Sequence, residues 1–511
     1  MYFTQALHRV LQHEPDRIAW IDGEHRATFA EFADRVARLA GGLRSLGIGS
    51  GQRVGMLAAN RAQFFEYALA CPWIGAVASP LNTRWSLDEM AFQIDDAEIG
   101  VLFVDAPRLD QALELRRRCA TLDTIVAFGA AAMPRDVVDY ATLIETSPSV
   151  PDARTDPDAL AVLMYTGGTT GTPKGVMLSA RQMLVSAYGS AVSVGFPNLP
   201  GRYLHAAPLF HLAAFGGLVQ QMMIGSTHVF IGEFDVPALC AAIERERITT
   251  TTLVPTMIPW LLDHAAQRGS DLSSLEYISY GAAPMTRPIL DRLFTALPHV
   301  RLRQGYGMTE LAPVATILRD EDHHDPAHPE RLRSVGRAAA HTEIRIVDES
   351  DRVVPRGTVG EVVVRGENIM LGYWKNPEAT AAAIRAGWMH TGDAGYLDEH
   401  GYLFLVDRIK DMIVSGGENV YSAEVEKALL QHPSVSACAV IGVPDEVWGE
   451  RVHAVVVLEP GTSASADELR DFVGEHIARY KAPRTVDFVA ALPLSPVGKI
   501  LKRVLREELA K

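Results

Sequence analysis

The chain has 511 residues, of which 48% are hydrophobic and 22% are charged, so it is long enough for two or more globular domains. Its formal net charge of -14 argues against a nucleic-acid partner, which normally requires a basic surface, but it does not exclude nucleotides. The N-terminal residues lack the apolar run of a signal peptide, and four scattered cysteines fit a reducing compartment, so we expect a cytoplasmic protein without disulfides.

The first part of the chain alternates helical and strand patterns. A capping box at Thr28 and Glu31 predicts a helix that ends near residue 47, and a second helix is expected over residues 61–73. Strands are expected over residues 53–57, 100–104 and 124–128. This order is typical of α/β layers built on parallel sheets.

The later part of the chain changes character twice. Residues 343–364 contain short strand patterns separated by Gly and Pro turns, which indicates a β-rich subdomain. After Asp407 the helices and strands start again and predict a small α+β domain. We therefore expect an N-terminal domain over residues 1–409 and a C-terminal domain over residues 410–511.

A loop of Gly and Thr is the strongest chemical signal in the sequence. It follows a strand expected over residues 160–165 and ends at Lys174. Glycines allow backbone amides to converge on an anion, threonines add hydroxyl donors, and the lysine adds a positive charge. Pro173 excludes a Walker A loop, and a flexible linker would not need the lysine, so the loop is predicted to bind phosphate. Its candidate residues are Thr166, Gly167, Gly168, Thr169, Thr170, Gly171 and Lys174.

Six further motifs lie after this loop. Residues 304–310 read Gln-Gly-Tyr-Gly-Met-Thr-Glu, which combines an aromatic plane suited to a base with a carboxylate suited to Mg²⁺. Taken alone, the others are ordinary turns or charged surface segments. They are Tyr-Gly-Ala-Ala-Pro at 280–284, His-Thr-Gly-Asp at 390–393 with Asp-Arg-Ile-Lys-Asp at 407–411, Ser-Gly-Gly-Glu-Asn-Val-Tyr at 415–421, and Pro-Val-Gly-Lys at 496–499.

In order and spacing these motifs resemble those of the adenylate-forming superfamily, which includes acyl- and aryl-CoA synthetases, adenylation domains of nonribosomal peptide synthesis and beetle luciferases. The resemblance covers nearly the whole chain. It implies an α/β N-terminal domain of layered sheets with a β-rich subdomain, and a small mobile α+β domain that rotates about a hinge at Lys410. It also implies ATP, Mg²⁺ and coenzyme A as cofactors and cosubstrates.

The resemblance assigns the nucleotide contacts. Tyr306 would stack on adenine, Thr309 would touch the α-phosphate, and Glu310 would hold Mg²⁺. Asp393 would accept the ribose hydroxyls, with Arg408 as a second ribose contact. The segments expected on the adenine side include Gly281, Ala282, Ala283, Gln304 and Gly307.

The resemblance also assigns residues to the two half-reactions. Lys499 would bridge the substrate carboxylate and the α-phosphate, although Ser-Pro-Val at 495–497 stands where small or polar residues are commoner. His211 would line the acyl pocket and act as a gate towards the thiol. Gly417 and Trp448 would contact coenzyme A. Further candidates for its phosphates are Arg84, Lys481 and Arg484.

The expected reaction is formation of an acyl-adenylate followed by transfer of the acyl group to coenzyme A. Segments 188–196, 211–217, 281–284 and 307–314 would build a mostly small and apolar pocket, which favours a fatty or aryl acid. A carrier-protein thiol or a nitrogen nucleophile stays open as the alternative acceptor. The expected partners are small molecules, without nucleic acid or a membrane span, and a homodimer is left open.

Two other stretches could be mistaken for sites. The apolar residues 205–225 include two histidines and two glutamines, so we expect a buried core or pocket wall there. The acids and histidines of 320–324, with His328, resemble a metal cluster but lack a regular ligand spacing. They are expected to form a solvated loop.

Overall fold

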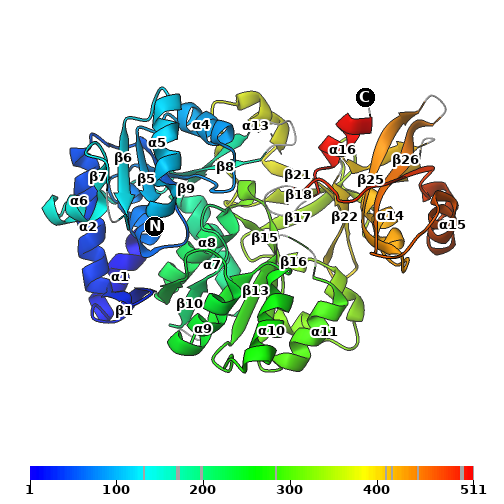
Figure 1. The fold of residues 1–511 in the computed structure, drawn as a ribbon, viewed down its shortest axis with the longest axis horizontal. Coiled ribbons are helices and arrows are strands. Elements are labelled where there is room, and N and C mark those ends of the chain that lie inside the picture. Colours follow the sequence, from blue (N-terminus) through cyan, green and yellow to red (C-terminus); the bar gives the residue numbers. More distant parts are fainter. Residues whose placement is uncertain are drawn as a thin grey trace. The chain divides into compact units, whose positions relative to one another are not determined.

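The computed structural model describes residues 1–130, 133–167, 173–195, 200–281, 283, 285–408, 411–415, 418–445, 448–494 and 500–509 (Figure 1). The chain divides into two units. The first consists of residues 1–344 and 364–389, and the second of residues 345–363 and 390–511. Among the described elements, every helix is too short or too polar to cross a bilayer.

An eight-stranded sheet in the first unit carries the phosphate-loop motif. Its order is β19-β9-β8-β4-β3-β5-β6-β7, parallel from β8 through β7 and antiparallel at β9 and β19. The expected strands at 53–57 and 124–128 are confirmed, and the one expected at 100–104 begins one residue later. The strands are β3 (Arg53–Leu57), β4 (Val77–Pro80), β5 (Val101–Asp105), β6 (Thr124–Phe128), β7 (Val138–Asp139), β8 (Leu160–Thr166), β9 (Lys174–Ser179) and β19 (Gly372–Tyr373).

A nine-stranded sheet in the same unit carries the adenine-side motifs. Its order is β16-β15-β14-β13-β12-β10-β11-β1-β2, and strands β14 to β1 along this order are parallel. The strands are β1 (Ile18–Asp22), β2 (His25–Thr28), β10 (Arg202–His205), β11 (Thr227–Phe230), β12 (Thr250–Leu253), β13 (Tyr277–Gly281), β14 (Arg301–Gly307), β15 (Val314–Leu318) and β16 (Arg337–Ala338).

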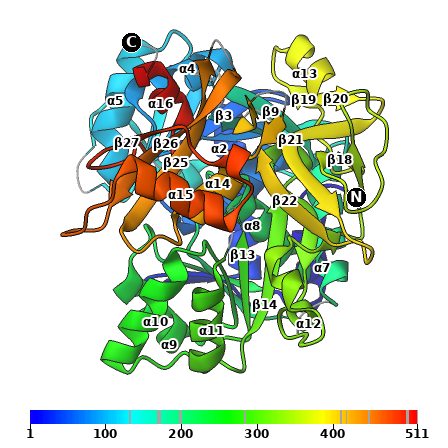
Figure 2. The same ribbon diagram turned by 90° about the vertical axis from the view of Figure 1, so that its right-hand side faces the viewer.

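Helices cover both faces of these two sheets. One continuous core joins residues of both sheets to α2 (Phe29–Ser45), α3 (Ala62–Trp73), α7 (Ala180–Ser193) and α8 (Leu212–Ile224), so these helices lie between the sheets. A second core packs α9 (Val236–Glu246), α10 (Met257–Arg268) and α11 (Arg287–Ala296) on the nine-stranded sheet, as Figure 2 shows beside β13 and β14. A third core packs α4 (Leu87–Asp96) and α5 (Leu109–Arg118) on the eight-stranded sheet. The layered α/β class is therefore confirmed, as is the capping box that starts α2.

The remaining helices of the first unit are short. They are α1 (Gln5–His13), α6 (Tyr140–Thr146), α12 (Asp320–His323) and α13 (Pro377–Ala383), with 3₁₀ turns η1 (Ala106–Arg108), η2 (Thr309–Leu311) and η3 (Pro329–Arg333).

The second unit contains the β-rich segment and the C-terminal residues. A five-stranded sheet, most of which lies in this unit, has the order β17-β18-β21-β20 with β22 beside β21. Its strands are β17 (Glu343–Val347), β18 (Gly360–Arg365), β20 (Ile384–Arg385), β21 (Trp388–Leu397) and β22 (Leu403–Arg408). The β-rich character expected for residues 343–364 is thus confirmed.

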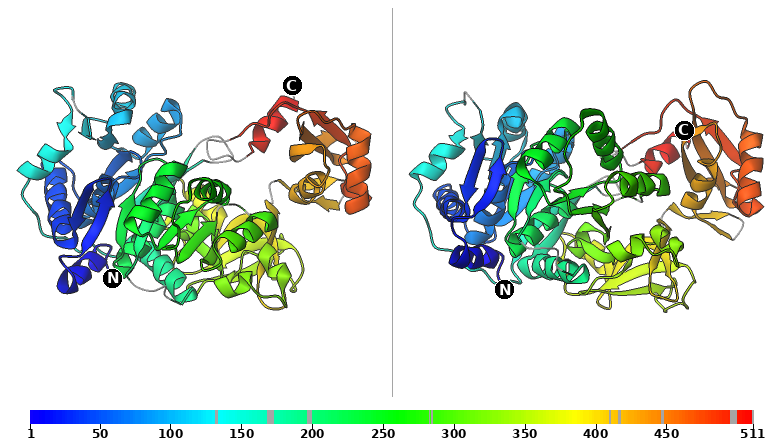
Figure 3. Two further views of the ribbon diagram at one scale, coloured as in Figure 1. Left: turned by 60° about the horizontal axis from the view of Figure 1, so that its bottom comes forward. Right: turned by 90° about the horizontal axis from the view of Figure 1, so that it is seen from below.

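A second five-stranded sheet forms the end of the chain, in the order β24-β23-β26-β25 with β27 beside β26. Its helices lie beside the strands, as the orange and red part of Figure 3 shows. The strands are β23 (Ile413–Ser415), β24 (Glu418–Val420), β25 (Val435–Asp445), β26 (Gly449–Leu458) and β27 (Thr485–Phe488). The helices are α14 (Ser422–Leu429), α15 (Ala466–His476), α16 (Lys502–Leu509) and the 3₁₀ turn η5 (Arg479–Lys481).

Candidate active site

The predicted phosphate loop connects two antiparallel strands. Thr166 at the end of β8 pairs with Lys174 at the start of β9, so the loop is the tip of a hairpin. Gly167 is the first loop residue after β8. The ends of the loop are therefore fixed by sheet pairing, while Gly168, Thr169, Thr170 and Gly171 lie outside the described residues.

A tyrosine that the sequence analysis did not single out links Lys174 to Glu310. Tyr373 lies in β19, which pairs with β9, and the ring centroid is 5.1 Å from the Nζ of Lys174. Its hydroxyl donates a hydrogen bond of 2.8 Å to Oε1 of the buried Glu310. Burial, and then the charge of Glu310, raise the pKa of Tyr373, so its hydroxyl keeps its proton and is the donor. The lysine and the carboxylate proposed to hold Mg²⁺ thus share one aromatic neighbour.

The backbone around Tyr373 is anchored to the hairpin on both sides. The amide of Tyr373 donates to Oγ1 of Thr380 (2.8 Å), and the amide of Trp374 donates to the carbonyl of Gly175 (2.7 Å). The indole of Trp374 and the hydroxyl of Tyr165 both bond to Asp96, at 2.9 Å and 2.5 Å. A Gly-Tyr-Trp sequence followed by an Asn-Pro helix start was the only signal for this segment in the sequence.

Glu310 fits the requirement for Mg²⁺. Mg²⁺ in nucleotide sites is commonly held by one or two carboxylates together with substrate phosphates. Glu310 is 7% exposed and lies in η2 directly after β14, with Thr309 beside it. No group of three or more His, Cys, Asp or Glu side chains in the described part of the chain could hold a metal on its own. The donor set therefore matches a metal bound together with a nucleotide.

The adenine-side motifs meet at the ends of two neighbouring parallel strands. Gly281 of β13 pairs with Gly305 of β14, and a Cβ on Gly281 would lie 2.5 Å from the carbonyl oxygen of Gly305. A Cβ on Gly307 would lie 1.9 Å from the carbonyl oxygen of Pro313. Small residues are therefore required by the close approach of backbone at this edge. Ala283 is exposed, Tyr306 is half-buried in β14, and Ala282 and Pro284 lie outside the described residues.

The acidic and histidine-rich segment is only in part the solvated loop that we expected: Glu321 and His324 are exposed, but their neighbours are not. Residues 320–323 form α12, and Asp322 and His323 are each 4% exposed. His323 lies 2.7 Å from the hydroxyl of Tyr280, which in turn donates a long hydrogen bond (3.4 Å) to Oε1 of Gln304. The carboxylate of Asp322 accepts a hydrogen bond from the amide of Arg319 and so caps α12. His323 therefore contacts β13 through Tyr280, and Tyr280 in turn contacts β14 through Gln304.

Two of the four segments expected to line the acyl pocket, 188–196 and 211–217, lie largely on α7 and α8, which pack together. His211 is the N-cap residue of α8 and is half-buried, as are Gly216 and Gly217, while Ala213 is exposed. The apolar stretch predicted to be core or pocket wall is thus confirmed as α8. Phe196, at the end of the segment expected on α7, lies outside the described residues.

One end of this region is filled by His341. A Cβ on Gly189 of α7 would lie 2.0 Å from Nδ1 of His341, whose Nε2 lies 3.0 Å from the carbonyl oxygen of Val314. Burial lowers the pKa of His341, so the ring is neutral. His341 therefore contacts two of the segments expected to line the acyl pocket.

The two residues of the second unit that are predicted to bind ribose lie opposite each other. Asp393 of β21 pairs in register with Arg408 of β22, and Nε of Arg408 is 2.7 Å from Oδ1 of Asp393. The aspartate is buried, whereas the arginine side chain is 45% exposed. Two motifs that are separate in the sequence are thus brought together in this unit.

The candidate contacts of coenzyme A are only partly brought together. The guanidinium of Arg484 lies 3.9 Å from the ring centroid of Trp448, which is 39% exposed. Lys481 instead forms an ion pair with Glu424 at 2.7 Å, and the exposed Arg84 belongs to the other unit. Lys410, Gly417 and Lys499 lie outside the described residues.

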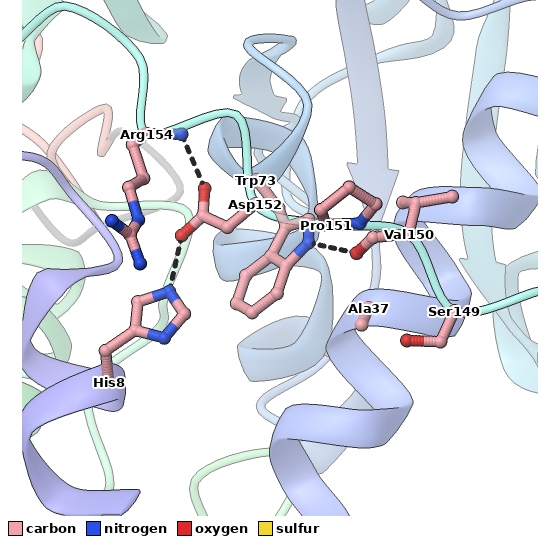
Figure 4. A pocket seen from close by; sticks show the side chains of 8 residues that line it. All are labelled: His8, Ala37, Trp73, Ser149, Val150, Pro151, Asp152 and Arg154. Carbon is pink, nitrogen blue, oxygen red and sulfur yellow. Dashed lines mark hydrogen bonds and ion pairs between the residues drawn. The ribbon is translucent and has the colours of Figure 1, made fainter. Parts of the chain in front are cut away.

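A surface pocket of the first unit contains none of these residues. It is lined by His8, Trp73, Asp152 and Arg154 among others, and His8 is 2.7 Å from the buried carboxylate of Asp152 (Figure 4). The indole of Trp73 donates to the carbonyl of Val150 (2.9 Å). The connection around residues 149–154 is therefore tied to α1 and α3 through this pocket.

Comparison with known proteins gives a consistent result. Residues 7–374 match the family model described as AMP-binding enzyme, and residues 424–499 match the model described as AMP-binding enzyme C-terminal domain. A feruloyl-CoA synthase from Amycolatopsis sp is 40% identical over 495 residues, which cover 96% of each chain.

Solved structures agree with this match. The structure of an amide bond synthetase from Marinactinospora thermotolerans has 34% sequence identity and a TM-score of 0.86, and the match covers 99% of each chain. The o-succinylbenzoate coenzyme A synthetase from Bacillus subtilis, in complex with ATP and magnesium ion, has 32% identity and a TM-score of 0.85 over 99% of each chain.

Proposed function

Because the chain belongs to the AMP-binding enzyme family, we propose that one set of its residues serves the first half-reaction of an acid–thiol ligase and another set serves the second. The enzyme is an AMP-forming carboxylate–CoA ligase that acts through an acyl-adenylate on an apolar aryl or fatty acid. It uses ATP, Mg²⁺ and coenzyme A. The observation that carries this function is the arrangement of Lys174, Tyr373 and Glu310 at the end of the hairpin.

In the first half-reaction, a carboxylate oxygen of the acid attacks the α-phosphorus of ATP, and pyrophosphate leaves. The hairpin loop and Lys174 bind phosphate oxygens, and Thr309 contacts the α-phosphate. Glu310 would hold Mg²⁺, and the bound ion would neutralise phosphate charge. Lys499 stabilises the charge that develops at the α-phosphate, so positioning and electrostatics carry the step without a side-chain nucleophile.

The base and the ribose are held by the other motifs. Tyr306 stacks on adenine beside the close-packed glycines of β13 and β14. Asp393 and Arg408 bind the ribose, which is supported by their direct pairing across β21 and β22.

In the second half-reaction, the thiolate sulfur of coenzyme A attacks the acyl carbon, and AMP leaves as the carbon–oxygen bond breaks. Gly417 and Trp448 contact coenzyme A, and His211 gates the acyl pocket. We place the domain boundary at residues 409 and 410, with Lys410 as the hinge. This placement is supported by the C-terminal family match, which begins at residue 424. A cytoplasmic location is proposed because all four cysteines are unpaired and buried.

Among apolar acids we favour one that carries a ring. This preference is supported by the similarity to the feruloyl-CoA synthase, which carries a ring-bearing acid in its name. An amide-forming enzyme is the second candidate. It is favoured by one observation, the similarity of the whole chain to the amide bond synthetase.

The test is pyrophosphate release with a panel of aryl, fatty and short branched acids, each with coenzyme A, with a primary amine, or with neither. Repeated turnover with an aryl acid only in the presence of coenzyme A, together with a new thioester, is the expected result. Turnover that depends on the amine would identify the amide-forming alternative. Absence of pyrophosphate release with every acid would contradict adenylation itself.

A further inference from the structure

We infer that Tyr373 is a positioning residue for adenylation, with two separable tasks: its hydroxyl orients the Glu310 carboxylate for Mg²⁺, and its ring holds Lys174 towards the nucleotide phosphates. This inference rests on the proposed function, because it takes the roles of Glu310 and Lys174 from it. It goes beyond that function by adding a residue that lies outside every motif used to assign the site.

The first task follows from the hydrogen bond to Oε1 of Glu310. A carboxylate that binds a metal must present its oxygens in a fixed plane, and hydrogen bonds from neighbouring groups commonly fix that plane. The bond is 2.8 Å long and joins two buried groups. The amide of Met370 also donates to the backbone carbonyl of Glu310 at 2.9 Å, so the segment before Tyr373 holds the backbone of the glutamate as well.

The second task follows from the position of the ring. The ammonium of Lys174 lies 5.1 Å from the ring centroid, within the range of a cation–π interaction. Lysine has four rotatable bonds, so an isolated side chain at the end of a strand would lose much entropy when it binds phosphate. A ring that already restricts the side chain lowers that cost.

Tyr373 can contact Lys174 and Glu310 at the same time because its own backbone is held in place by hydrogen bonds. Thr380 and Gly175 fix the backbone on either side of its ring. Trp374 and Tyr165 both bond to Asp96, which ties this segment to the strand that leads into the loop. Tyr373 is therefore positioned by the same sheet edge that positions the hairpin.

Two substitutions separate the two tasks. Tyr373→Phe removes the hydroxyl and keeps the ring, whereas Tyr373→Leu removes both. Tyr140→Phe is the matched control, because the hydroxyl of Tyr140 also donates to a buried glutamate, Glu66, at 2.5 Å, and plays no part in the proposed site. All three variants are compared with the wild type for folding by thermal unfolding.

The quantities measured are the equilibrium binding of Mn²⁺ and of ATP. The carboxylic acid substrate is left out, so that no reaction takes place. Binding of Mn²⁺, as a paramagnetic substitute for Mg²⁺, is measured on the ATP-saturated full-length enzyme by electron paramagnetic resonance. Binding of ATP is measured separately in the presence of EDTA. Tyr373→Phe should weaken Mn²⁺ binding by roughly tenfold or more, as expected for a lost hydrogen bond to a charged group, and leave metal-free ATP binding unchanged. Tyr373→Leu should also weaken metal-free ATP binding, by roughly threefold.

A double substitution tests whether the effect passes through the carboxylate. In a Glu310→Gln background, Tyr373→Phe should cause little further loss of Mn²⁺ binding, because the two groups act as one unit. Additive losses, wild-type Mn²⁺ binding in Tyr373→Phe, or equal weakening in Tyr140→Phe would each overturn the inference. If the wild type itself fails to bind Mn²⁺ with ATP and makes no adenylate, the proposed function fails instead.

Discussion

Lys174, Tyr373 and Glu310 in the first unit are joined through a buried aromatic ring, whereas Asp393 and Arg408 in the second unit meet directly across two paired strands. In the first cluster, Lys174 and Glu310 each contact Tyr373, which comes from another part of the chain. In the second cluster the two side chains form an ion pair with each other, and Arg408 is nearly half exposed. A buried network has one geometry and loses its function when a member is removed, whereas a pair with one solvated partner can adjust. We therefore expect the two clusters to respond differently to substitution.

The largest effect is expected at the buried cluster. Glu310→Gln keeps the shape of the side chain but removes the charge that would hold Mg²⁺, so kcat/KM for acid-dependent pyrophosphate release should fall by roughly 10²–10³-fold. Glu321→Gln, at an exposed position on α12, is the control and should retain activity. A loss of less than tenfold in Glu310→Gln would remove the first cluster from the metal site.

A smaller effect is expected at the pair of Asp393 and Arg408, in which only the arginine is exposed. Asp393→Asn weakens the proposed hydrogen bonds to the ribose, so the KM for ATP should rise by roughly tenfold while kcat changes less. The temperature of unfolding should move little, because the partner arginine is partly solvated. Glu399→Gln, an exposed change between β21 and β22, serves as the control. A large fall in kcat at constant KM would mean that Asp393 acts on the chemical step, and the contrast between the clusters would be lost.

The smallest effect concerns two histidines in the interior of the nine-stranded sheet. His205 and His228 are fully buried, with ring nitrogens 2.9 Å apart, and burial lowers the pKa of both, that of His228 to about 3. Their unfolded pKa is near 6.5, so the unfolded chain takes up protons first as the pH falls. Stability is thus fully present near pH 8 and declines progressively as the pH falls through 6.5, with a loss of roughly 1 kcal/mol in the free energy of unfolding between pH 8 and pH 6.5.

Urea unfolding at these two pH values measures this loss. A double variant, His205→Phe with His228→Phe, should show a smaller pH dependence than the wild type, whatever its stability at pH 8. An identical pH dependence in both proteins would assign the effect to other groups.

Most of the correct predictions came from patterns of residues that are close together in the sequence. The capping box of Thr28 and Glu31, and the strands at 53–57 and 124–128, depend on residues that are neighbours in the chain. The same holds for the Gly and Thr loop, whose ends the hairpin register of Thr166 and Lys174 confirms. Propensity and periodicity act over such short distances, so a single sequence is enough to find these elements.

Contacts between distant segments could not be predicted in this way. Tyr373 reaches Glu310 across 63 residues, and nothing within its own segment marks it as part of a site. His323 was misjudged for the same reason, because its burial depends on Tyr280, which lies 43 residues earlier. The roles of the motif residues came from a resemblance to a family, and the structure adds the side chains that support them.

The close approach of Gly189 and His341 has a consequence for redesign of the acyl pocket that we propose beside α7. The imidazole occupies the space where any side chain at position 189 would begin. The two positions therefore have to be changed together. Replacing Gly189 alone would push the ring against Val314 or distort α7. Shortening His341 alone would leave a hollow beside the helix, and only a paired exchange would reshape that wall while keeping it filled.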